Sequence, residues 1–308
     1  MENKRYKLGS RDSPLAMWQA RKVQDLLSAK GMATEIVAVK SEGDLDLVTP
    51  LYAMGVQGVF TKTLDAYLLS GHIDLAVHSM KDVPVQPAQG IIQAAVPERA
   101  SSSDVIVWKS GAKTMEELEA GPYTIGTGSV RRRSFWLHRF PHHQVENLRG
   151  NIQTRLRKLE QSDWAGAVFA RAGLERMEMT GLQTTALDWM LPAPAQGALM
   201  VVCREEDAVL QARIGQIDHI PTSLCVLQER SFLSALHGGC STPIGAHAEI
   251  REERMYFKGS IVNVTGREMM QVEEDVLIDQ AGDIGQRCAQ KLLDQGAGRI
   301  VAQIRHLQ

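Results

Sequence analysis

The sequence predicts an α/β protein in which two similar α/β domains face each other across a cleft and a smaller α+β domain follows. Three observations support this prediction. Apolar strand-like runs alternate with helix-like runs until about residue 217, and the pattern becomes antiparallel after residue 220. In addition, the segments LGSRDS at 8–13 and IGTGSV at 125–130 resemble each other.

The first domain begins with the strand-like segment YKLGS at 6–10. Ser13 and Pro14 have the form of a helix N-cap and first helical residue, and LAMWQARKVQDLLSAK continues that helix. TEIVAVK is the next strand, and DLAVHSM is a buried strand that runs into the polar loop KDVPVQP. Because ligands of such sheets bind at the carboxyl ends of strands, these loops are candidate binding segments.

The segment 121–173 repeats this plan. Strand YTIG, loop TGS, helix VRRRSFWLHRF, strand QVENL, helix NIQTRLRKLEQ and strand AGAVFA follow one another with short connections. In LGSRDS and IGTGSV alike, an aliphatic residue, a glycine and a hydroxyl residue close a strand before a helix. The sequence therefore predicts a weak internal duplication.

The C-terminal part has a different pattern. TSLCVLQERSFLSALH reads as a helix, and Gly238 and Gly239 are expected to supply its left-handed end. Segments 247–266 and 268–278 alternate like antiparallel strands, and DIGQRCAQKLLDQG is expected to be the last helix. The expected domains are 1–97 with 197–217, 103–194, and 220–308.

The composition is that of an ordinary globular protein, with 308 residues, 44% apolar and 23% charged. No apolar run approaches the roughly 20 residues of a membrane span, and no signal-like segment opens the chain, so we expect a cytoplasmic protein without a membrane partner. The cysteines at 203, 225, 240 and 288 have no CxxC spacing and no histidines at metal-ligand intervals. Free thiols and no structural metal are expected.

A basic segment contrasts with the overall net charge of −2. Between Arg131 and Lys158, seven arginines and one lysine face a single acid, Glu146, which gives a formal charge of +7. GTGSVRRRS and LRGNIQTRLRK place these arginines at two successive strand-to-helix turns, where backbone N–H groups favour anions. Each arginine alone could be part of a solvated helix face, but the set indicates a ligand with several carboxylates or phosphates.

Asp82 stands in SMKDVP, at the end of a buried strand, between Lys81 and Pro84. A carboxylate there lies at the mouth of an α/β cleft. An ordinary aspartate is ionised at neutral pH, so Asp82 fits a stabiliser of positive charge or a proton relay better than a resting acid. An aspartate that caps a turn with its side chain fits the motif equally well.

Cys240 differs from the other three cysteines because Gly238 and Gly239 precede it and a Ser-Thr-Pro turn follows. Cys203, Cys225 and Cys288 lie in apolar patterns and are expected in the core. A thiol on such a loop can be a nucleophile or an attachment point. His237 is its one nearby histidine, which favours attachment over a protease-like role.

Taken together and in this order, AVHSMKDVP, GTGSVRRRS, LRGNIQTRLRKLE, PAPAQGA and LHGGCSTPIG closely resemble the porphobilinogen deaminase family, also called hydroxymethylbilane synthases. The resemblance covers nearly the whole chain. It implies three domains, the first two similar to type II periplasmic binding proteins. It also implies a transferase that joins four porphobilinogen molecules, releases ammonia at each step and hydrolyses off hydroxymethylbilane for tetrapyrrole and haem biosynthesis. The chain grows on a dipyrromethane cofactor held by a thioether to the cysteine of the GGC loop, here Cys240.

The resemblance implies a role for each matching residue, and each pyrrole carries an acetate and a propionate that suit arginine. Asp82 matches the catalytic aspartate, which would stabilise positive charge on pyrrole nitrogen. The residues implied to hold the cofactor and growing chain are Ser79, Lys81, Asp82, Thr127, Ser129, Arg131, Arg132, Arg149, Gly150 and Arg155. Those implied to bind the incoming substrate are Arg11, Ser13, Gln19, Arg149, Arg155 and Arg176.

Three positions depart from the common family pattern. Gln57 stands where GGKGLF has a lysine and cannot replace that charge, so the 53–60 loop could serve as a lid but is not expected to draw in the substrate electrostatically. Gly128 replaces a serine of GTSSLRR and offers no hydroxyl, and Thr63 stands where an acid is common.

Two other functions fit parts of the sequence. A non-catalytic anion-binding module on the same two-domain cleft explains the arginines but gives Cys240 no role. A nucleic-acid-binding protein fits the basic segment, but the whole chain is slightly acidic and its arginines lie at strand-to-helix turns. We therefore expect a small-molecule enzyme, monomeric and without a nucleic-acid partner.

Overall fold

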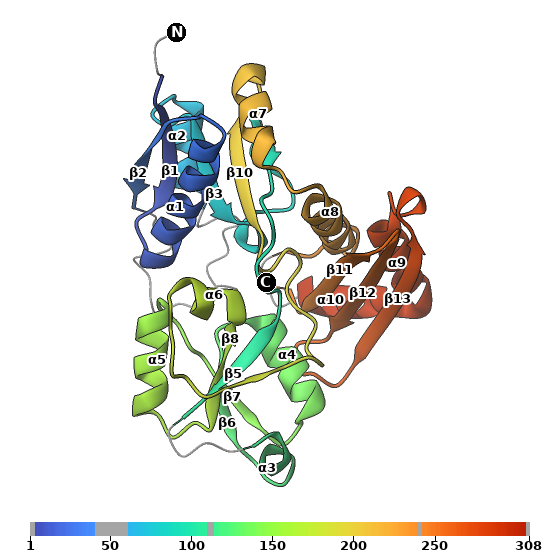
Figure 1. Ribbon diagram of the computed structural model, residues 1–308. Coiled ribbons are helices and arrows are strands. Elements are labelled where there is room, and N and C mark those ends of the chain that lie inside the picture. The colour runs from blue at the N-terminus through green and yellow to red at the C-terminus, as the bar shows by residue number, and fades with distance from the viewer. Residues whose placement is uncertain (1–3, 41–60, 110–113, 240–241, 306–308) are drawn as a thin grey trace. The chain divides into compact units, whose positions relative to one another are not determined.

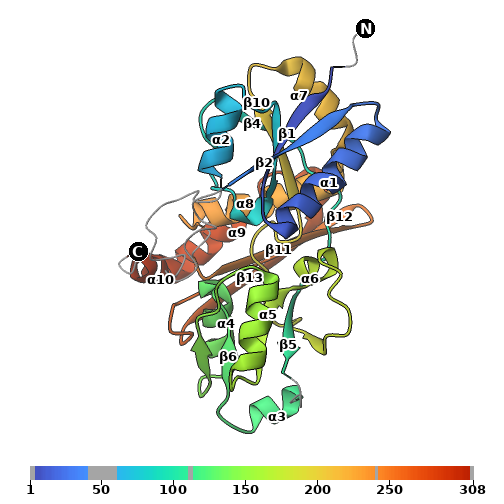
Figure 2. The same cartoon turned by 90° about the vertical axis from the view of Figure 1, so that its left-hand side faces the viewer.

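The computed structural model describes residues 4–40, 61–109, 114–239 and 242–305, which form two compact units (Figures 1 and 2). The first unit comprises described residues up to 100 together with 197–224, and the second comprises 101–196 and 225–305. Most residues expected in domains 2 and 3 share the second unit. The three sets of domain limits stay a prediction.

The first unit contains a five-stranded sheet of order β2-β1-β3-β10-β4, in which β10 runs antiparallel to its neighbours β3 and β4. β1 pairs in parallel with both β2 and β3. The elements of this unit are β1 (Tyr6–Arg11), α1 (Pro14–Ala29), β2 (Thr34–Val39), α2 (Lys62–Leu69), β3 (Leu75–Ser79), the 3₁₀ turn η3 (Met80–Asp82), β4 (Ile91–Ala95), β10 (Leu199–Arg204), α7 (Ala208–Ile214) and η4 (Gly215–Ile217).

Helices cover both faces of this sheet, as strand alternation requires (Figure 2). Leu8 of β1 is fully buried against Val23 and Leu27 of α1. The next residue, Gly9, faces the opposite side, where an added Cβ would lie 3.1 Å from Leu64 of α2. The missing side chain at Gly9 therefore allows α2 to approach the sheet closely.

The second unit contains a sheet with the same plan, of order β7-β6-β8-β5-β9, with β5 antiparallel to β8 and β9. The fourth strand in each order is thus the antiparallel one, so the two sheets share one topology. The elements are β5 (Asp104–Trp108), α3 (Met115–Glu119), β6 (Thr124–Gly126), α4 (Val130–Arg139), β7 (Gln144–Glu146), α5 (Ile152–Gln161), β8 (Gly166–Ala170), α6 (Arg171–Arg176) and β9 (Thr184–Ala186).

The two similar segments of the sequence occupy equivalent places in these sheets. LGSRDS ends β1 and leads to Ser13, whose side chain caps α1; IGTGSV ends β6 and leads to Ser129, whose side chain caps α4. In both cases the strand is second in its sheet order. The expected duplication is confirmed by this shared topology.

The C-terminal part is a three-stranded antiparallel sheet, β11-β12-β13, with helices packed on it. Its elements are α8 (Ile220–Ala235), β11 (Ile244–Arg251), β12 (Arg254–Val262), β13 (Met269–Leu277), η5 (Ile278–Gln280), α9 (Ile284–Leu292), a π turn (Leu293–Ala297) and α10 (Gly298–Arg305). Phe232 of α8 packs against Phe257 of β12, with ring centroids 5.5 Å apart and ring planes tilted by 59°. The expected small α+β domain is confirmed.

Two details of this part differ from the sequence prediction. The left-handed residue after α8 is His237, with φ 54°, and not Gly238 or Gly239. Gly238 is required for a different reason, because an added Cβ would lie 2.5 Å from Leu233 and 2.6 Å from Ile244. The segment DIGQRCAQKLLDQG is also not the last helix, since the chain bends at Gly296, with φ 102°, and α10 follows.

Candidate functional site

In the first unit, predicted site residues gather at the carboxyl ends of β1 and β3. These strands are parallel neighbours, so their ends lie at the same edge of the sheet. Arg11 ends β1, and the Ser13 side chain accepts a hydrogen bond from the N–H of Ala16 (3.4 Å) as the cap of α1. Gln19, buried on α1, donates from Nε2 to Oγ of Ser79 at the end of β3 (2.8 Å). Residues that the resemblance assigns to cofactor and to substrate therefore lie at the same edge of this sheet.

Asp82 closes a 3₁₀ turn that follows β3 directly, and both Asp82 and Lys81 are partly exposed. The Val83 N–H donates to the Met80 carbonyl and closes this turn through the backbone. The Asp82 carboxylate makes no hydrogen bond or ion pair with any other residue that the structure describes. The turn-capping interpretation of Asp82 therefore has no support, and the carboxylate is available to a ligand.

His78 lies beside this edge and was not singled out from the sequence. Burial and the positive charge of Arg11 lower the pKa of His78 to about 4, so the imidazole is neutral at pH 7. A neutral imidazole adds no competing charge next to Arg11.

In the second unit, three parallel strand ends carry the other predicted residues. Thr127 follows β6, where its hydroxyl oxygen accepts from the Ser129 N–H (3.3 Å), and Ser129 caps α4 by accepting from the Arg132 N–H (3.4 Å). Gly128 has no room for a side chain, because an added Cβ would lie 2.6 Å from the Leu148 carbonyl oxygen. The missing hydroxyl at this position thus has a steric reason.

Arg149 and Gly150 follow β7 at the same edge, and Arg149 is 6% exposed. Gly150 has φ 113°, a value that a residue with a side chain rarely adopts, and an added Cβ would lie 2.7 Å from Thr154. This conformation directs the Gly150 carbonyl to Nε of Arg155 (2.7 Å), one turn into α5. The glycine therefore fixes Arg155 relative to the strand end.

Arg176 ends α6, which follows the neighbouring strand β8. It is 9% exposed, and burial lowers its pKa to about 10 against the opposing effect of Glu175. Arg176 nevertheless remains cationic at neutral pH.

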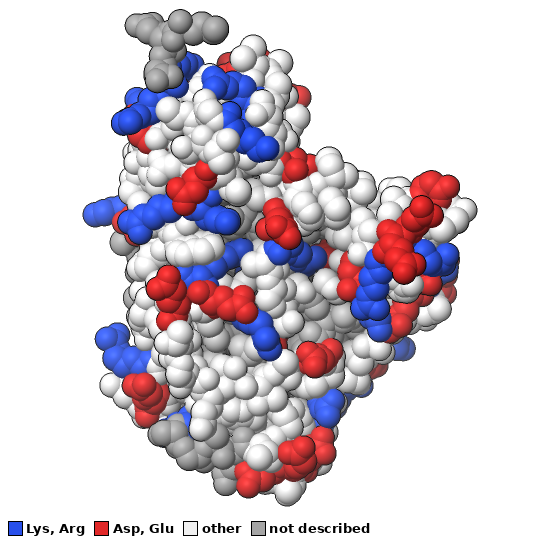
Figure 3. All heavy atoms as spheres, viewed as in Figure 1, with Lys and Arg blue, Asp and Glu red and all other residues white. Residues whose placement is uncertain are grey.

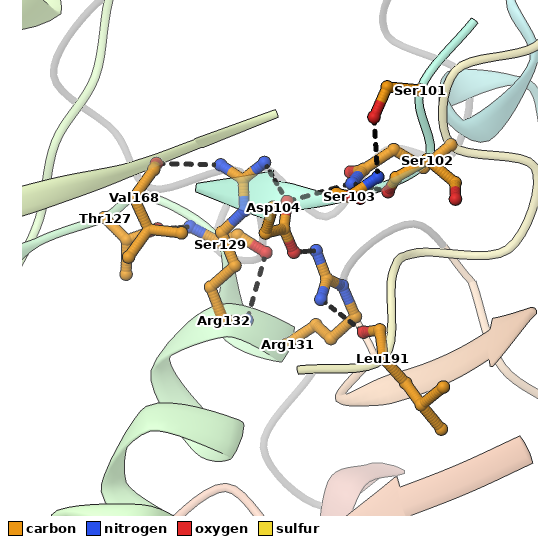
Figure 4. Close-up of polar contacts among 11 residues, drawn as sticks. Ser101, Ser102, Ser103, Asp104, Thr127, Ser129, Arg131, Arg132, Val168 and Leu191 are labelled. Atoms are coloured by element: carbon orange, nitrogen blue, oxygen red, sulfur yellow. Dashed lines mark hydrogen bonds and ion pairs between the residues drawn. The ribbon is translucent and has the colours of Figure 1, made fainter. Parts of the chain in front are cut away.

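Arg131 and Arg132 are buried and share one carboxylate, that of Asp104 at the start of β5 (Figure 4). Nη2 of Arg131 donates to Oδ2 of Asp104 (2.6 Å), and Nε and Nη2 of Arg132 both donate to Oδ1 (3.1 and 2.8 Å). Nη1 of each arginine donates to a backbone carbonyl, that of Leu191 for Arg131 (2.6 Å) and that of Val168 for Arg132 (3.0 Å). Two cations against one anion leave this cluster a net charge of +1.

The electrostatics of the cluster are dominated by burial and mutual charge. Burial alone would raise the pKa of Asp104, but Arg131, Arg132 and the hydrogen bond from Gln196 outweigh it and lower the pKa to about 2. Burial lowers the pKa of Arg131 although Asp104 opposes this. Nε of Arg131 is buried and has no hydrogen-bond partner within the described ranges. One buried donor of the cluster is therefore left without a hydrogen bond among the described residues.

Asp104 and Gln196 are functional candidates that the sequence reasoning missed. Asp104 was visible as the one acid at the head of the apolar run DVIVW, and Gln196 stands in PAPAQGA. Their significance depends on partners far along the chain, since Gln196 donates to Asp104 from 92 positions away.

Cys240 and Gln57 lie outside the described residues. On either side of residues 240–241, the Thr242 N–H donates to the Gly239 carbonyl (3.1 Å), and the Thr242 hydroxyl donates to the same oxygen (2.7 Å). The other three cysteines are buried and form no disulfide within the described part of the chain, as expected. Burial raises the pKa of Cys203 to about 11 and that of Cys288 to about 12, so neither forms a thiolate at neutral pH.

The charges on the visible surface do not form a single-sign patch over the described residues drawn in Figure 3, where basic and acidic side chains are interspersed. The arginines of the cluster are buried instead, which is unlike a nucleic-acid-binding face. In the described part of the chain, no group of His, Cys, Asp and Glu is arranged to hold a metal. No helix in the same part is long and apolar enough to cross a membrane.

The fold and site together define an α/β protein with a duplicated sheet, whose strand ends carry arginines suited to a small ligand with several carboxylates. Comparison with known proteins identifies the family within this class. The family model "porphobilinogen deaminase, dipyromethane cofactor binding domain" matches residues 6–212, and "porphobilinogen deaminase, C-terminal domain" matches residues 223–294. The chain therefore belongs to the porphobilinogen deaminase family.

Individual relatives agree with this assignment. The chain is 38% identical over 306 residues to a porphobilinogen deaminase of Syntrophotalea carbinolica, covering 98% of this chain and 96% of the relative. It is 40% identical over 302 residues to a porphobilinogen deaminase of Pelotomaculum thermopropionicum, covering 97% and 96%. The sequence-based expectation of a transferase with a dipyrromethane cofactor is confirmed, and the non-catalytic anion-binding module is not favoured.

Among solved structures, the chain is similar to a periplasmic arginine-transport binding protein from Legionella pneumophila, with 14% identity, a TM-score of 0.40, and coverage of 69% of this chain and 91% of the other. It is also similar to a methionine-binding protein, with 13% identity, a TM-score of 0.43, and coverage of 70% and 90%.

Proposed function

We propose that the chain assembles hydroxymethylbilane for haem biosynthesis, as a cytoplasmic monomer, on a dipyrromethane attached through a thioether to Cys240. The observation that carries this proposal is the Arg131–Arg132–Asp104 cluster, a buried site with a net positive charge. The division into domains 1–97 with 197–217, 103–194 and 220–308 belongs to the same proposal.

The donor set suits the carboxylates of a pyrrole chain. Guanidinium groups bind carboxylates through paired hydrogen bonds, and the buried Nε of Arg131 is one donor that no described residue uses. The residues that would hold the cofactor and growing chain are Ser79, Lys81, Asp82, Thr127, Ser129, Arg131, Arg132, Arg149, Gly150 and Arg155. When bound, the dipyrromethane would supply the free pyrrole α-carbon to which the first porphobilinogen is joined.

Asp82 is proposed as the catalytic residue. Its carboxylate follows the end of a strand and has no intramolecular partner among the described residues. It would accept hydrogen bonds from pyrrole N–H groups and stabilise the positive charge that develops on the pyrrole nitrogen. It could also carry the proton released at each condensation. Arg11, Ser13, Gln19 and Arg176, with Arg149 and Arg155, would bind the incoming substrate, since arginine holds carboxylates but is a poor proton donor.

The attachment of the cofactor is tested by intact mass spectrometry of the purified protein. We expect a mass excess equal to two linked pyrrole units in the wild type, and its loss in Cys240→Ser. Cys203→Ala is the matched control, because that thiol is buried and its pKa is raised to about 11, so the excess should remain. An active wild-type preparation with an unmodified mass would refute the attachment.

A further inference from the structure

The segment 191–196 lies between the arginine cluster and the C-terminal α+β part, and contacts both. On one side, the Leu191 carbonyl accepts from Nη1 of Arg131 (2.6 Å), and Nε2 of Gln196 donates to Oδ1 of Asp104 (2.9 Å). Gln196 also donates to the Ser102 carbonyl (2.7 Å), two residues before Asp104. Both ends of the segment thus touch the cluster.

The other side of the same segment is bonded to β11 and α8. The Ala195 N–H donates to Oε2 of Glu229 (2.6 Å), and the other oxygen of Glu229 accepts from the N–H of Ala248 on β11 (2.8 Å). The Ala246 N–H donates to the Pro192 carbonyl (3.1 Å). Glu229 therefore joins the segment to a strand that begins shortly after the GGC loop.

The conformation of the segment depends on these contacts. Ala195 has φ 61°, a left-handed value that costs a residue with a Cβ about 1 kcal/mol or more and persists only where the surroundings impose it. Glu229 has 0% exposure, so its carboxylate must be satisfied by such donors. Gly245 lets β11 approach, because an added Cβ there would lie 2.7 Å from Cβ of Leu191.

We propose that Gln196 and Glu229 are positioning residues for the Arg131–Arg132 pair. Glu229 holds Ala195 in its left-handed conformation, this directs the Gln196 amide onto Asp104, and Asp104 fixes the two guanidinium groups. The C-terminal part that carries Cys240 thereby sets the orientation of the arginines that receive the carboxylates of the pyrrole chain. This inference rests on the proposed role of the arginine pair in holding the cofactor.

The test compares cofactor assembly in variants of the full-length protein. Gln196→Met keeps the length of the side chain and removes the hydrogen bonds that its amide donates to Ser102 and Asp104. Glu229→Gln replaces one acceptor oxygen by an amide NH₂ group and leaves Gln196 itself unchanged. This variant still tests the inference if Gln196→Met does not fold. Each variant is isolated as the folded monodisperse fraction and incubated with porphobilinogen, and loading is followed by intact mass.

The matched control is Gln228→Met. Gln228 is 2% exposed and Gln196 is 1% exposed, and the Gln228 amide also makes two backbone hydrogen bonds, to Gly282 and Gly285, but none to the cluster. A merely structural effect would appear equally in both glutamine variants. Arg132→Lys serves as the separate test of the proposed role of the arginines.

We expect Gln196→Met and Glu229→Gln to load about tenfold more slowly per folded molecule, as the loss of one or two hydrogen bonds implies, while Gln228→Met loads like the wild type. Loading of the two variants at the wild-type rate, with Arg132→Lys impaired, would overturn the inference and leave the proposed function standing. Equal slowing in Gln228→Met would overturn it as well. Normal loading of Arg132→Lys would overturn the proposed role of the pair, and the inference with it.

Discussion

Replacement of Asp104 by asparagine tests whether the buried arginine pair depends on its shared carboxylate. Asp104 has 0% exposure and accepts from both Arg131 and Arg132, so Asp104→Asn leaves two buried cations without an anion. Removing one partner of a buried ion pair typically costs about 3–5 kcal/mol. Depending on the size of the cooperative unit, this corresponds to a fall in melting temperature of roughly 6–20 °C.

The dependence on pH supplies an independent measure of the same interaction. The folded-state pKa of Asp104 is about 2, below the ordinary aspartate value of 3.8, so its contribution is present above pH 4 and is lost as the pH falls through 2. A shift of this size corresponds to about 2 kcal/mol. The wild type should therefore lose about this much stability between pH 4 and pH 2 relative to Asp104→Asn.

Urea unfolding followed by tryptophan emission is a suitable assay, because four of the five tryptophans, at 108, 136, 164 and 189, lie in the second unit. Asp275→Asn is the control, since Asp275 pairs with Arg254 in an exposed ion pair in the same unit, with side chains 44% and 41% exposed. That change should cost less than about 1 kcal/mol. If Asp104→Asn were no more costly than Asp275→Asn, the shared carboxylate would not be what stabilises the pair.

Three further predictions concern turnover and packing. Asp82→Asn should keep its bound cofactor, seen by intact mass, yet lose most activity, since general acid–base catalysis contributes roughly 10²–10⁴-fold; near-normal turnover would assign the chemistry to another group. Arg155→Ala should shift the distribution of enzyme-bound intermediates towards shorter chains, and an unchanged distribution would return Arg155 to a solvated helix face. Gly285→Ala should destabilise by about 1–3 kcal/mol in thermal unfolding, because its Cβ would overlap the Gln228 carbonyl of α8, whereas Gly282→Ala, with nothing within 4 Å, should be neutral.

The parts of the fold that the sequence predicts are those fixed by local chemistry. Ser13 and Ser129 cap helices because their hydroxyls accept from backbone groups three residues ahead, an interaction visible in any short window. The strand-to-helix turns follow from the same signals, so the residues at the strand ends could be grouped correctly. The duplication could also be predicted, because the turns LGSRDS and IGTGSV share an aliphatic residue, a glycine and a hydroxyl residue.

The parts that the sequence does not predict depend on distant partners. The position of Arg131 and Arg132 at a helix start predicted an anionic ligand, and the family resemblance implied that they hold the cofactor. Their ion pairs with Asp104, which span 27 and 28 positions, were not predicted. The side chain of an arginine at a helix start can point to a ligand or to a buried acid, and the local sequence pattern is the same in both cases. His237 likewise took the left-handed position expected of a glycine, while Gly238 packs closely against Leu233 and Ile244, two residues that no local pattern connects with it.

A single carboxylate shared by two arginines combines two requirements that otherwise conflict. An arginine that is free in solution has about 2 kcal/mol of side-chain entropy to lose on binding, so a site that holds its guanidinium groups beforehand binds more tightly. Asp104 and the carbonyls of Leu191 and Val168 hold both groups in this way. A second acid would cancel the remaining positive charge, and no acid at all would leave two buried cations to repel each other. One acid for two arginines therefore keeps the pair oriented and leaves one positive charge, which the proposed binding of a carboxylate would use.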